Sequence, residues 1–529
     1  MKNLISSLFL ILGFNVSKSQ TTNHGIDVNW YQTPKPAATI TGTISPMNNV
    51  SGSVANSMVV KSDGTVIIFY RQGGQNKWTQ SSDGGNTWTN PGTLPAPAIM
   101  GLSTITADID QSNNIYIVWK SGNFSLGFSK FNGTSWTPTY TINTTTQTTA
   151  DTVGFSQITV DRNGRIHVMW QQGNHQNYSG SFYSTCWYAR SVDGGNTFTT
   201  SQLSQNTTNY HHAAFPVADF GGTSHDTLMI AWRENVNGCS GNMPSMCSPN
   251  GWNWDVKARI TYDGGANWNP VISIQGTGAL NDTDDDQWDP NIIVDKNGVI
   301  HAFYHVYHNT TMPDYNANIM YEYSLNGGNT WSTPIQLSTT NIRSHLIKTA
   351  YDYNNNYVWC TWKDEMDFGN LSSGNPQADL KAVYIQNTGT PIISTQEFIT
   401  DHDSSEVALH NFKVGNDGIM RATYNISILQ GKGDTIFYTQ RSTLTVGIKD
   451  NVISDRFRVY PNPTTDQINV VFDESIINEN FEIKLFNMQG QLIEERRNDL
   501  SPLQLPAAGV YILEIKIGEV KQSEKIIRE

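Results

Sequence analysis

The octapeptide SSDGGNTW, residues 81–88, has three close relatives in the same chain: SVDGGNTF at 191–198, TYDGGANW at 261–268 and SLNGGNTW at 324–331. Each copy places an Asp or Asn before two glycines and ends in a large aromatic residue. An Asp or Asn oxygen at this point accepts hydrogen bonds from the N–H groups of a turn, and glycine permits a positive φ. The closing Trp or Phe can pack its ring between strands. The octapeptide therefore predicts a tight turn between two strands.

A second repeat consists of an apolar strand, a turn rich in Asp, Asn and Gly, and another apolar strand that ends in aromatic residues. Turn dipeptides such as Asn163-Gly164 and Asp417-Gly418 are strong signals for a β-hairpin. Seven copies begin at residues 57, 105, 157, 213, 291, 345 and 410. A second pair of strands follows each copy, and the octapeptide, where present, lies between those later strands. Four antiparallel strands repeated around a ring predict an all-β chain with a β-propeller of seven blades, or of six if a terminal copy is misread.

The octapeptide resembles the Asp-box, or BNR, motif of the sialidase superfamily. Its key positions are Asp83, Asp193, Asp263 and Asn326, the last with Asn in place of Asp. The resemblance implies that these four residues are structural and lie far from any active centre. Sialidases also carry an Arg-Ile-Pro motif before the first full blade, and Val54 stands where its Arg should be. This departure argues against true sialidase activity, although the resemblance to the fold family stands.

The two ends of the chain predict export. Residues 1–19 hold Lys2, an apolar run from Leu4 to Phe14 and small residues before Gln20, which is the pattern of a signal peptide. No other stretch is long and apolar enough to span a membrane. The tail resembles the C-terminal sorting domain of type IX secretion cargo in Bacteroidetes, through YPNP at 460–463, Gly490 and GVY at 509–511. We expect a signal peptide at 1–19, a propeller at 20–448 and a small β-sandwich sorting domain at 449–529, recognised by the type IX secretion machinery.

The composition limits the possible partners. The chain has 529 residues, 15% of them charged, and a net charge of −13. This acidic balance excludes nucleic acid and leaves a polysaccharide or glycoconjugate open. The four cysteines have no zinc spacing. Cys239 and Cys247 could close a surface loop through a disulfide, whereas Cys186 and Cys360 lie in apolar strands and are expected to be buried.

Propeller geometry predicts where ligands meet the ring. The octapeptide turns and the first turn of each blade share one face, so residues before first strands and after second strands meet on the opposite face. Many of those residues are polar or charged, as a site for an anionic or hydroxyl-rich ligand requires. For catalysis we select His211, His212, Arg233, His305 and Arg343. For substrate binding we select Arg71, Trp288, Asp289, His345, Glu365, Glu406 and His410.

Three functions fit these residues. The first is a secreted, sialidase-like propeller that engages and possibly cleaves a complex glycan, for instance by hydrolysis with paired carboxylates. The second is a polysaccharide lyase, in which an Arg or Lys neutralises a uronate carboxylate and a His or Tyr moves the proton. The third is a non-catalytic glycan-binding or adhesion protein that stacks sugars on Trp rings. The tryptophans considered are Trp170, Trp232, Trp288 and Trp362, with core packing as the alternative for all but Trp288.

No cofactor or resident metal is expected. The acidic loop NDTDDDQWD at 281–289 alternates Asp282, Asp284 and Asp286, as calcium loops often do. The Gly and the closing Glu of an EF-hand are absent, so a solvated acidic loop is the favoured interpretation over a Ca²⁺ site.

Overall fold

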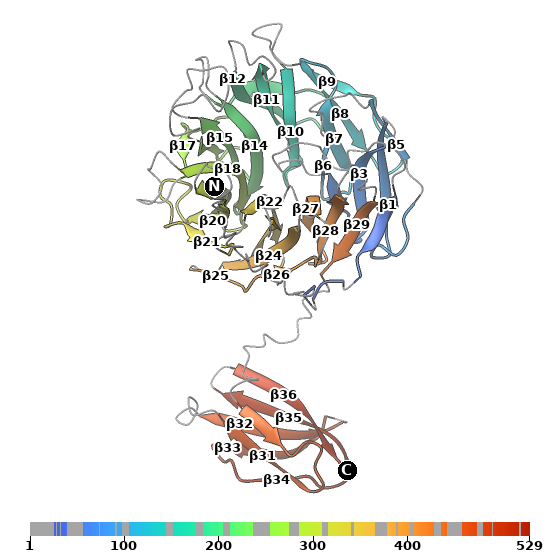
Figure 1. The fold of residues 1–529 in the computed structure, drawn as a ribbon, viewed down its shortest axis with the longest axis vertical. Coiled ribbons are helices and arrows are strands. Elements are labelled where there is room, and N and C mark those ends of the chain that lie inside the picture. Colours follow the sequence, from blue (N-terminus) through green and yellow to red (C-terminus); the bar gives the residue numbers. More distant parts are fainter. Residues whose placement is uncertain are drawn as a thin grey trace, which may run out of the picture. The chain divides into compact units, whose positions relative to one another are not determined.

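The computed structural model describes most of the chain in segments (Figure 1). The described residues are 26–27, 29–31, 33–39, 57–72, 75–89, 92–97, 105–143, 152–174, 183–204, 212–235, 254–274, 285–308, 316–339, 343–365, 378–387, 390–401, 406–427, 435–441, 457–472, 480–488, 490–517 and 520–529. The chain divides into two compact units, residues 1–443 and 444–529. The predicted signal peptide, Val54, His211, Cys239 and Cys247 lie outside the described residues.

Over the residues described, the strands of the first unit form seven blades, six with four strands and one with three long strands and two short edge strands, which confirms the predicted propeller. Figure 1 shows these sheets arranged around a central axis. Blade 1 contains β2 (Met58–Val60), β3 (Val66–Gln72), β4 (Gln75–Ser81) and β5 (Gly92–Pro97). Blade 2 contains β6 (Thr106–Ile109), β7 (Ile115–Lys120), β8 (Ser125–Phe131) and β9 (Tyr140–Asn143). Blade 3 contains β10 (Thr152–Val160), β11 (Ile166–Asn174), β12 (Tyr183–Ser191) and β13 (Thr199–Gln202).

The later blades repeat this order, and the last is completed from the other end of the chain. Blade 4 contains β14 (Ala213–Gly221), β15 (Thr227–Asn235), β16 (Trp254–Thr261) and β17 (Ile272–Ser273). Blade 5 contains β18 (Asp285–Val294), β19 (Ile300–His308), β20 (Asn316–Ser324) and β21 (Ile335–Gln336). Blade 6 contains β22 (Arg343–Asp352), β23 (Tyr357–Glu365) and β24 (Ala378–Asn387), with β25 (Pro391–Ile393) and β26 (Glu397–Phe398) at its edge. Blade 7 contains β27 (Glu406–Val414), β28 (Met420–Ser427), β29 (Thr435–Gln440) and the early strand β1 (Lys35–Thr39).

The apolar core of the propeller lies between neighbouring blades. One cluster joins blades 2 and 3 and includes Val118, Phe128 and Val168. Another joins blades 5 and 6 and includes Phe303 and Trp362. Cys186 and Cys360 are buried free thiols, as expected. Because every blade has apolar side chains on both faces of its sheet, stacking neighbours around a ring buries both faces.

The octapeptides form the predicted turns between third and fourth strands, in blades 1, 3, 4 and 5. In the first copy, Asp83 accepts hydrogen bonds from the Thr87 N–H at 2.9 Å, the Thr87 hydroxyl at 2.7 Å and the Ser81 hydroxyl at 2.8 Å. These bonds hold the pKa of Asp83 down at about 2. The second glycine, Gly85, has a φ of +82°, and a Cβ there would lie 2.4 Å from Tyr438 of blade 7. Glycine is therefore required both by the backbone and by the neighbouring blade.

A bulge recurs in the innermost strands at a point that the sequence did not reveal. The pairing register shifts between residues 154 and 157, 214 and 217, 288 and 291, and 345 and 348. Each of these bulges contains one non-glycine residue with a positive φ. These residues are Phe155, Phe215, Asp289 and Leu346, at φ values of +50°, +55°, +47° and +55°. A bulge re-aims side chains locally, so it determines which inner-strand residues reach the site described below.

The C-terminal unit is a β-sandwich of two antiparallel sheets over its described residues. One sheet contains β30 (Phe457–Tyr460), β31 (Gln467–Phe472) and β34 (Leu503–Gln504). The other contains β32 (Phe481–Asn487), β33 (Leu492–Arg497), β35 (Gly509–Ile517) and β36 (Val520–Arg528). Ile468 and Val470 of the first sheet share a buried core with Leu485 and Leu513 of the second. The sandwich agrees with the clean alternation of its strands.

Candidate functional site

Charged side chains gather at the ends of the inner strands that lie away from the tight turns. In blade 6, Arg343 pairs in register with Glu365, and His345 pairs with Lys363. These four residues stand at the start of β22 and the end of β23, whereas the turn between the two strands lies at the other end. Blade 5 places His305 at the equivalent end of β19, and blade 4 places Arg233 at the equivalent end of β15.

Glu365 is the centre of the blade 6 part of this cluster. Its Oε1 lies 2.9 Å from His345 Nε2 and 2.8 Å from Lys363 Nζ, and its Oε2 accepts a hydrogen bond from Arg343 Nη1 at 2.8 Å. Burial alone would raise the pKa of Glu365, but His345, Lys363 and Arg343 hold it well below its usual range. Glu365 therefore remains ionised and holds three cationic or protonatable groups in place.

Asp289 lies at the blade 5 bulge, beside blade 4. Its Oδ1 is 3.8 Å from Arg233 Nη1, and its side chain is only 6% exposed. Burial raises the pKa of Asp289, and Arg233, His345 and Lys348 partly oppose that rise. The Arg233 guanidinium also lies 4.2 Å from the ring centre of Phe215 and 4.7 Å from that of Trp254. The bulge thus brings a buried carboxyl group to an arginine held between aromatic rings.

The histidines of the cluster are kept neutral. His305 and His345 lie with ring centres 6.3 Å apart and nearly perpendicular. Burial lowers the pKa of both, and the nearby positive groups lower it further, except that Glu365 opposes the shift at His345. His410 accepts or donates a hydrogen bond with the Thr361 hydroxyl at 3.0 Å, and its pKa is also lowered, first by burial and then by Lys348 and Lys363. A neutral imidazole can accept a proton.

Lys348 completes the cluster from the middle of β22. Burial lowers its pKa to about 7, Lys413 lowers it further and Asp289 opposes the change. A buried lysine that titrates near neutrality is typical of a functional site. Positive charge therefore dominates this end of the channel even though the whole chain is acidic.

The structure brings together most of the residues selected from the sequence. Arg233, Asp289, His305, Arg343, His345, Glu365 and His410 are linked by the contacts and charge effects described above. His212 lies beside them, with its ring centre 6.1 Å from that of Trp254 and its Nδ1 3.2 Å from the Ser184 hydroxyl. His211 and the side chains of Arg71, Trp288 and Glu406 lie outside the described residues. Asp83, Asp193, Asp263 and Asn326 occupy the tight turns at the other ends of their strands.

For three of the four tryptophans considered, the structure decides for core packing over sugar stacking. Trp170, Trp232 and Trp362 are each 0% exposed, so none of them offers a ring face to a sugar. Their indole N–H groups bind neighbouring polar side chains instead, as Trp362 does with Asp364 at 2.6 Å. The aromatic residues at the ends of second strands are core residues because that strand is covered on both faces.

Sequence reasoning missed Lys348 and Lys363. Lys363 stands beside Asp364 and Glu365 after the second strand of blade 6, so its position alone could have selected it. Lys348 carried no such signal, because the bulge between His345 and Lys348 changes which side chains face the site. Among the residues that the structure describes, no group of three His, Cys, Asp or Glu side chains is arranged to hold a metal. The side chains of residues 282–286, for which a solvated acidic loop was favoured over a Ca²⁺ site, lie outside that part of the chain.

Comparison with protein families identifies the tail. Residues 458–529 match the family described as secretion system C-terminal sorting domain. The C-terminal unit carries a type IX sorting signal. This confirms the predicted tail and indicates that the protein is exported to the cell surface or beyond it. In the described part of the chain, no helix has the length and apolar character needed to cross a membrane. A search of curated proteins finds no match.

Several solved structures are similar to the chain. An ulvan lyase from a polysaccharide lyase family is 12% identical and covers 77% of this chain and 95% of its own, with a TM-score of 0.49. An α-L-arabinanase from Penicillium chrysogenum is 10% identical and covers 63% and 94%, with a TM-score of 0.38. An intramolecular trans-sialidase from Ruminococcus gnavus is 11% identical and covers 75% and 97%, with a TM-score of 0.36. At these identities and TM-scores, none of the three structures indicates the activity of this chain.

Proposed function

We propose that the propeller binds an anionic, uronate-containing polysaccharide at the Glu365 end of its channel and cleaves it as a lyase. The observation that carries this proposal is the excess of buried positive charge there. Arg233, Arg343, Lys348 and Lys363 face the two carboxyl groups of Asp289 and Glu365, and burial raises the pKa of Asp289. A polyanion would neutralise this charge.

The roles follow from position and exposure. The side chains of Arg343 and His345 are 22% and 11% exposed, whereas His305, whose ring centre lies 6.3 Å from that of His345, is only 1% exposed. Arg343, with Arg233, would hold the uronate carboxylate, because guanidinium groups bind carboxylates through paired hydrogen bonds. Neutralising that carboxylate makes the proton on C5 more acidic. His345, oriented by Glu365, would remove the C5 proton as a general base.

The proposed reaction is a β-elimination. The C5–H electrons form the C4–C5 double bond as the bond between C4 and the glycosidic oxygen breaks, and the leaving oxygen takes the proton back from the His345 imidazolium. Proton and electrons balance without water or any oxidant. Glu365 serves as a positioning residue, since it fixes the His345 ring and compensates the positive charge that forms on it.

Hydrolysis of a glycan is the second candidate. The pKa of Asp289 is raised and that of Glu365 is lowered, and a pair of carboxyl groups with separated pKa values is what acid and base roles need. Glu365, however, already binds three positive or protonatable groups, which weakens it as a base or nucleophile. A purely adhesive function loses support from the burial of Trp170, Trp232 and Trp362.

Two finer assignments are proposed with this function. The four octapeptide turns are Asp-boxes with a structural role, which is supported by the hydrogen bonds of Asp83, Asp193 and Asp263 to their own turns. Residues 1–19 form a signal peptide, which is supported by their charge and apolar pattern. The polysaccharide would thus be met outside the cell, after the type IX machinery has handled the tail.

One screen separates the candidates. Purified protein is incubated with uronate-containing and sialylated polysaccharides, and both ultraviolet absorbance and new reducing ends are measured. A lyase produces both signals on the uronate polymer, a hydrolase produces reducing ends without the absorbance, and a binding protein only retains the polymer. Arg343→Gln should abolish the absorbance, whereas Lys77→Gln, which removes a surface lysine bound to Thr93, should not. No absorbance on any uronate polymer would refute the lyase.

A further inference from the structure

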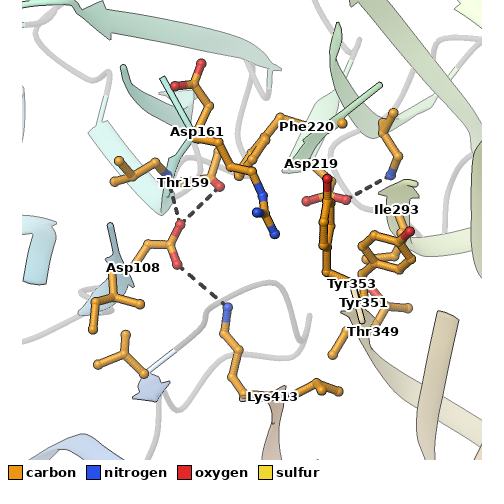
Figure 2. A pocket seen from close by; sticks show the side chains of 18 of the residues that line it. Asp108, Thr159, Asp161, Asp219, Phe220, Ile293, Thr349, Tyr351, Tyr353 and Lys413 are labelled. Carbon is orange, nitrogen blue, oxygen red and sulfur yellow. Dashed lines mark hydrogen bonds and ion pairs between the residues drawn. The ribbon is translucent and has the colours of Figure 1, made fainter. Parts of the chain in front are cut away.

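The tight-turn face of the propeller has a hollow of its own. A cavity of about 720 Å³ opens among the first turns of the blades and extends along the innermost strands as far as Lys348, which also belongs to the cluster described above. Figure 2 shows its lining side chains, with Asp108 and Lys413 joined across one part of it and Tyr353 projecting beside Asp219 and Tyr351. The octapeptide turns on this face predict a structural role only. The volume is in the range of small-molecule sites.

One turn position supplies the rim of this cavity. In several blades an Asp caps the first turn, as Asp161 does by accepting the N–H groups of Asn163 and Arg165 at 3.0 and 2.9 Å. Asp295 caps the turn of blade 5 in the same way. The next residue is not needed for the cap, and it lines the cavity. In six blades, the residues at this position are Ser62, Gln111, Arg162, Lys296, Tyr353 and Asn416.

None of those six residues is acidic, and the carboxylates deeper in the cavity are already engaged. Asp161 binds Arg165 and His167. Asp108 of blade 2 accepts the Val160 N–H of blade 3 at 2.8 Å, and its other oxygen is 3.8 Å from Lys413. Asp219 of blade 4 likewise accepts the Val294 N–H of blade 5 at 2.8 Å. Asp108 and Asp219 therefore link neighbouring blades, whereas Asp161 acts within blade 3.

Two cations meet on one tyrosine ring at the rim. The Arg162 guanidinium of blade 3 lies 3.6 Å from the ring centre of Tyr353 in blade 6, and Lys296 Nζ of blade 5 lies 5.6 Å from it. Lys296 Nζ also donates a hydrogen bond to the Tyr353 carbonyl at 3.3 Å. Within the described part of the chain, neither Arg162 nor Lys296 has a carboxylate at ion-pair distance. All three side chains are only partly buried, so solvent reaches them.

We propose that Arg162, Lys296 and Tyr353 form a second anion-binding site, which takes the carboxylate or sulfate ester of a sugar. An arginine stacked on an aromatic ring keeps its N–H edge free for two parallel hydrogen bonds to an oxyanion. The lysine adds a second charge, and the Tyr351 and Tyr353 rings offer apolar surface to a sugar. Three blades contribute, so the site exists only in the closed ring.

This site is distinct from the one around Glu365. Tyr353 directly follows β22, whereas His345 lies near the start of that strand. At about 3.3 Å per residue along a strand, the two sites are separated by roughly 20 Å or more. The inference rests on different residues from the proposed lyase, and either can fail without the other.

Calorimetric titration of the full-length protein tests this proposal. An Arg343→Gln background weakens the other site, and the probes are glucuronate, glucose 6-sulfate, glucose and inorganic sulfate. We expect binding of one or both charged sugars, none of glucose, and at least about tenfold weaker binding after Arg162→Gln or Lys296→Gln. Lys130→Gln is the matched control, because Lys130 lies 5.2 Å from the Tyr116 ring centre but outside the cavity.

The titrations show whether Arg162, Lys296 and Tyr353 form a binding site for a charged sugar or only attract anions without specificity. A preference between glucuronate and glucose 6-sulfate identifies which anion the site takes. Loss of affinity in Tyr353→Leu confirms that the Tyr353 ring contributes to binding. Inorganic sulfate binding as tightly as both sugars would leave an adventitious ion only and overturn the proposal. Equal affinity in the Arg162→Gln and Lys130→Gln proteins would overturn it as well. The lyase screen is unaffected by either result, because it depends on Arg343 and His345.

Discussion

Replacing Glu365 with Gln removes one negative charge and keeps the shape of the side chain. The carboxylate of Glu365 binds His345, Lys363 and Arg343 at 2.8 to 2.9 Å while being 13% exposed. Removing one partner from a buried ion pair costs about 3–5 kcal/mol, because the remaining charge is left uncompensated. Since the amide oxygen of Gln can still accept one of these hydrogen bonds, we expect a loss of about 3 kcal/mol.

The stability loss should depend on pH in a defined direction. The pKa of Glu365 is lower in the folded protein than in the unfolded chain. Glu365 therefore contributes fully to the free energy of unfolding at a pH above its pKa in the unfolded chain. The difference in the free energy of unfolding between wild type and Glu365→Gln should therefore be largest above about pH 4.3 and should decrease as the pH falls below that value. Denaturant unfolding followed by tryptophan fluorescence at two pH values measures it.

A matched control separates folding from catalysis. Glu397 forms a comparable buried pair, with Arg441 at 2.7 and 2.9 Å, and it accepts the Trp30 indole N–H, away from the candidate site. Glu397→Gln should cost about as much stability, again about 3 kcal/mol, with product formation retained. Glu365→Gln should lose product formation, and any remaining activity should appear at lower pH, because Glu365 raises the pKa of His345. Full activity in Glu365→Gln, or equal losses of activity in both variants, would refute the roles given to Glu365 and His345.

Three further predictions concern particular positions. Gly195→Ala should cost more stability than Gly194→Ala, by about 1–3 kcal/mol in denaturant unfolding, because a Cβ at 195 would lie 2.3 Å from Phe128 while the space at 194 is open. Burial lowers the pKa of Lys348 to about 7, so between pH 7 and 10 the unfolded chain binds more protons than the folded protein, and the free energy of unfolding should rise by up to about 4 kcal/mol. Lys348→Met should abolish this rise. Burial raises the pKa of Asp219 to about 7, so the free energy of unfolding should fall by up to about 4 kcal/mol between pH 4 and 7. Asp219→Asn should abolish this fall. A pH profile of stability that is unchanged in either variant would contradict the corresponding assignment.

The turn and hairpin repeats were readable from the sequence because they are local. Asp83 binds atoms within four residues of itself, so the octapeptide is sufficient to specify its turn. The blade count followed from the repeat number, and the end of the inner strands at which the charged cluster lies followed from where each turn must lie. The bulge that carries Asp289 was not readable, because a register shift of an inner strand leaves no fixed residue pattern. The burial of Trp170 and Trp232 was left open for a similar reason, since it depends on the neighbouring blade.

The amino-acid sequence by itself determined the four-stranded units, their tight turns and the export tail, each of which is specified by residues close together along the chain. Only the tertiary structure decided which charges meet. Closing the ring places Arg233 of blade 4 beside Asp289 of blade 5, and Arg162 of blade 3 against Tyr353 of blade 6. At Asp289, burial raises the pKa of the carboxyl group, and Arg233, which belongs to another blade, opposes that rise. These contacts join residues of different blades, so they depend on the tertiary structure and the amino-acid sequence alone does not reveal them.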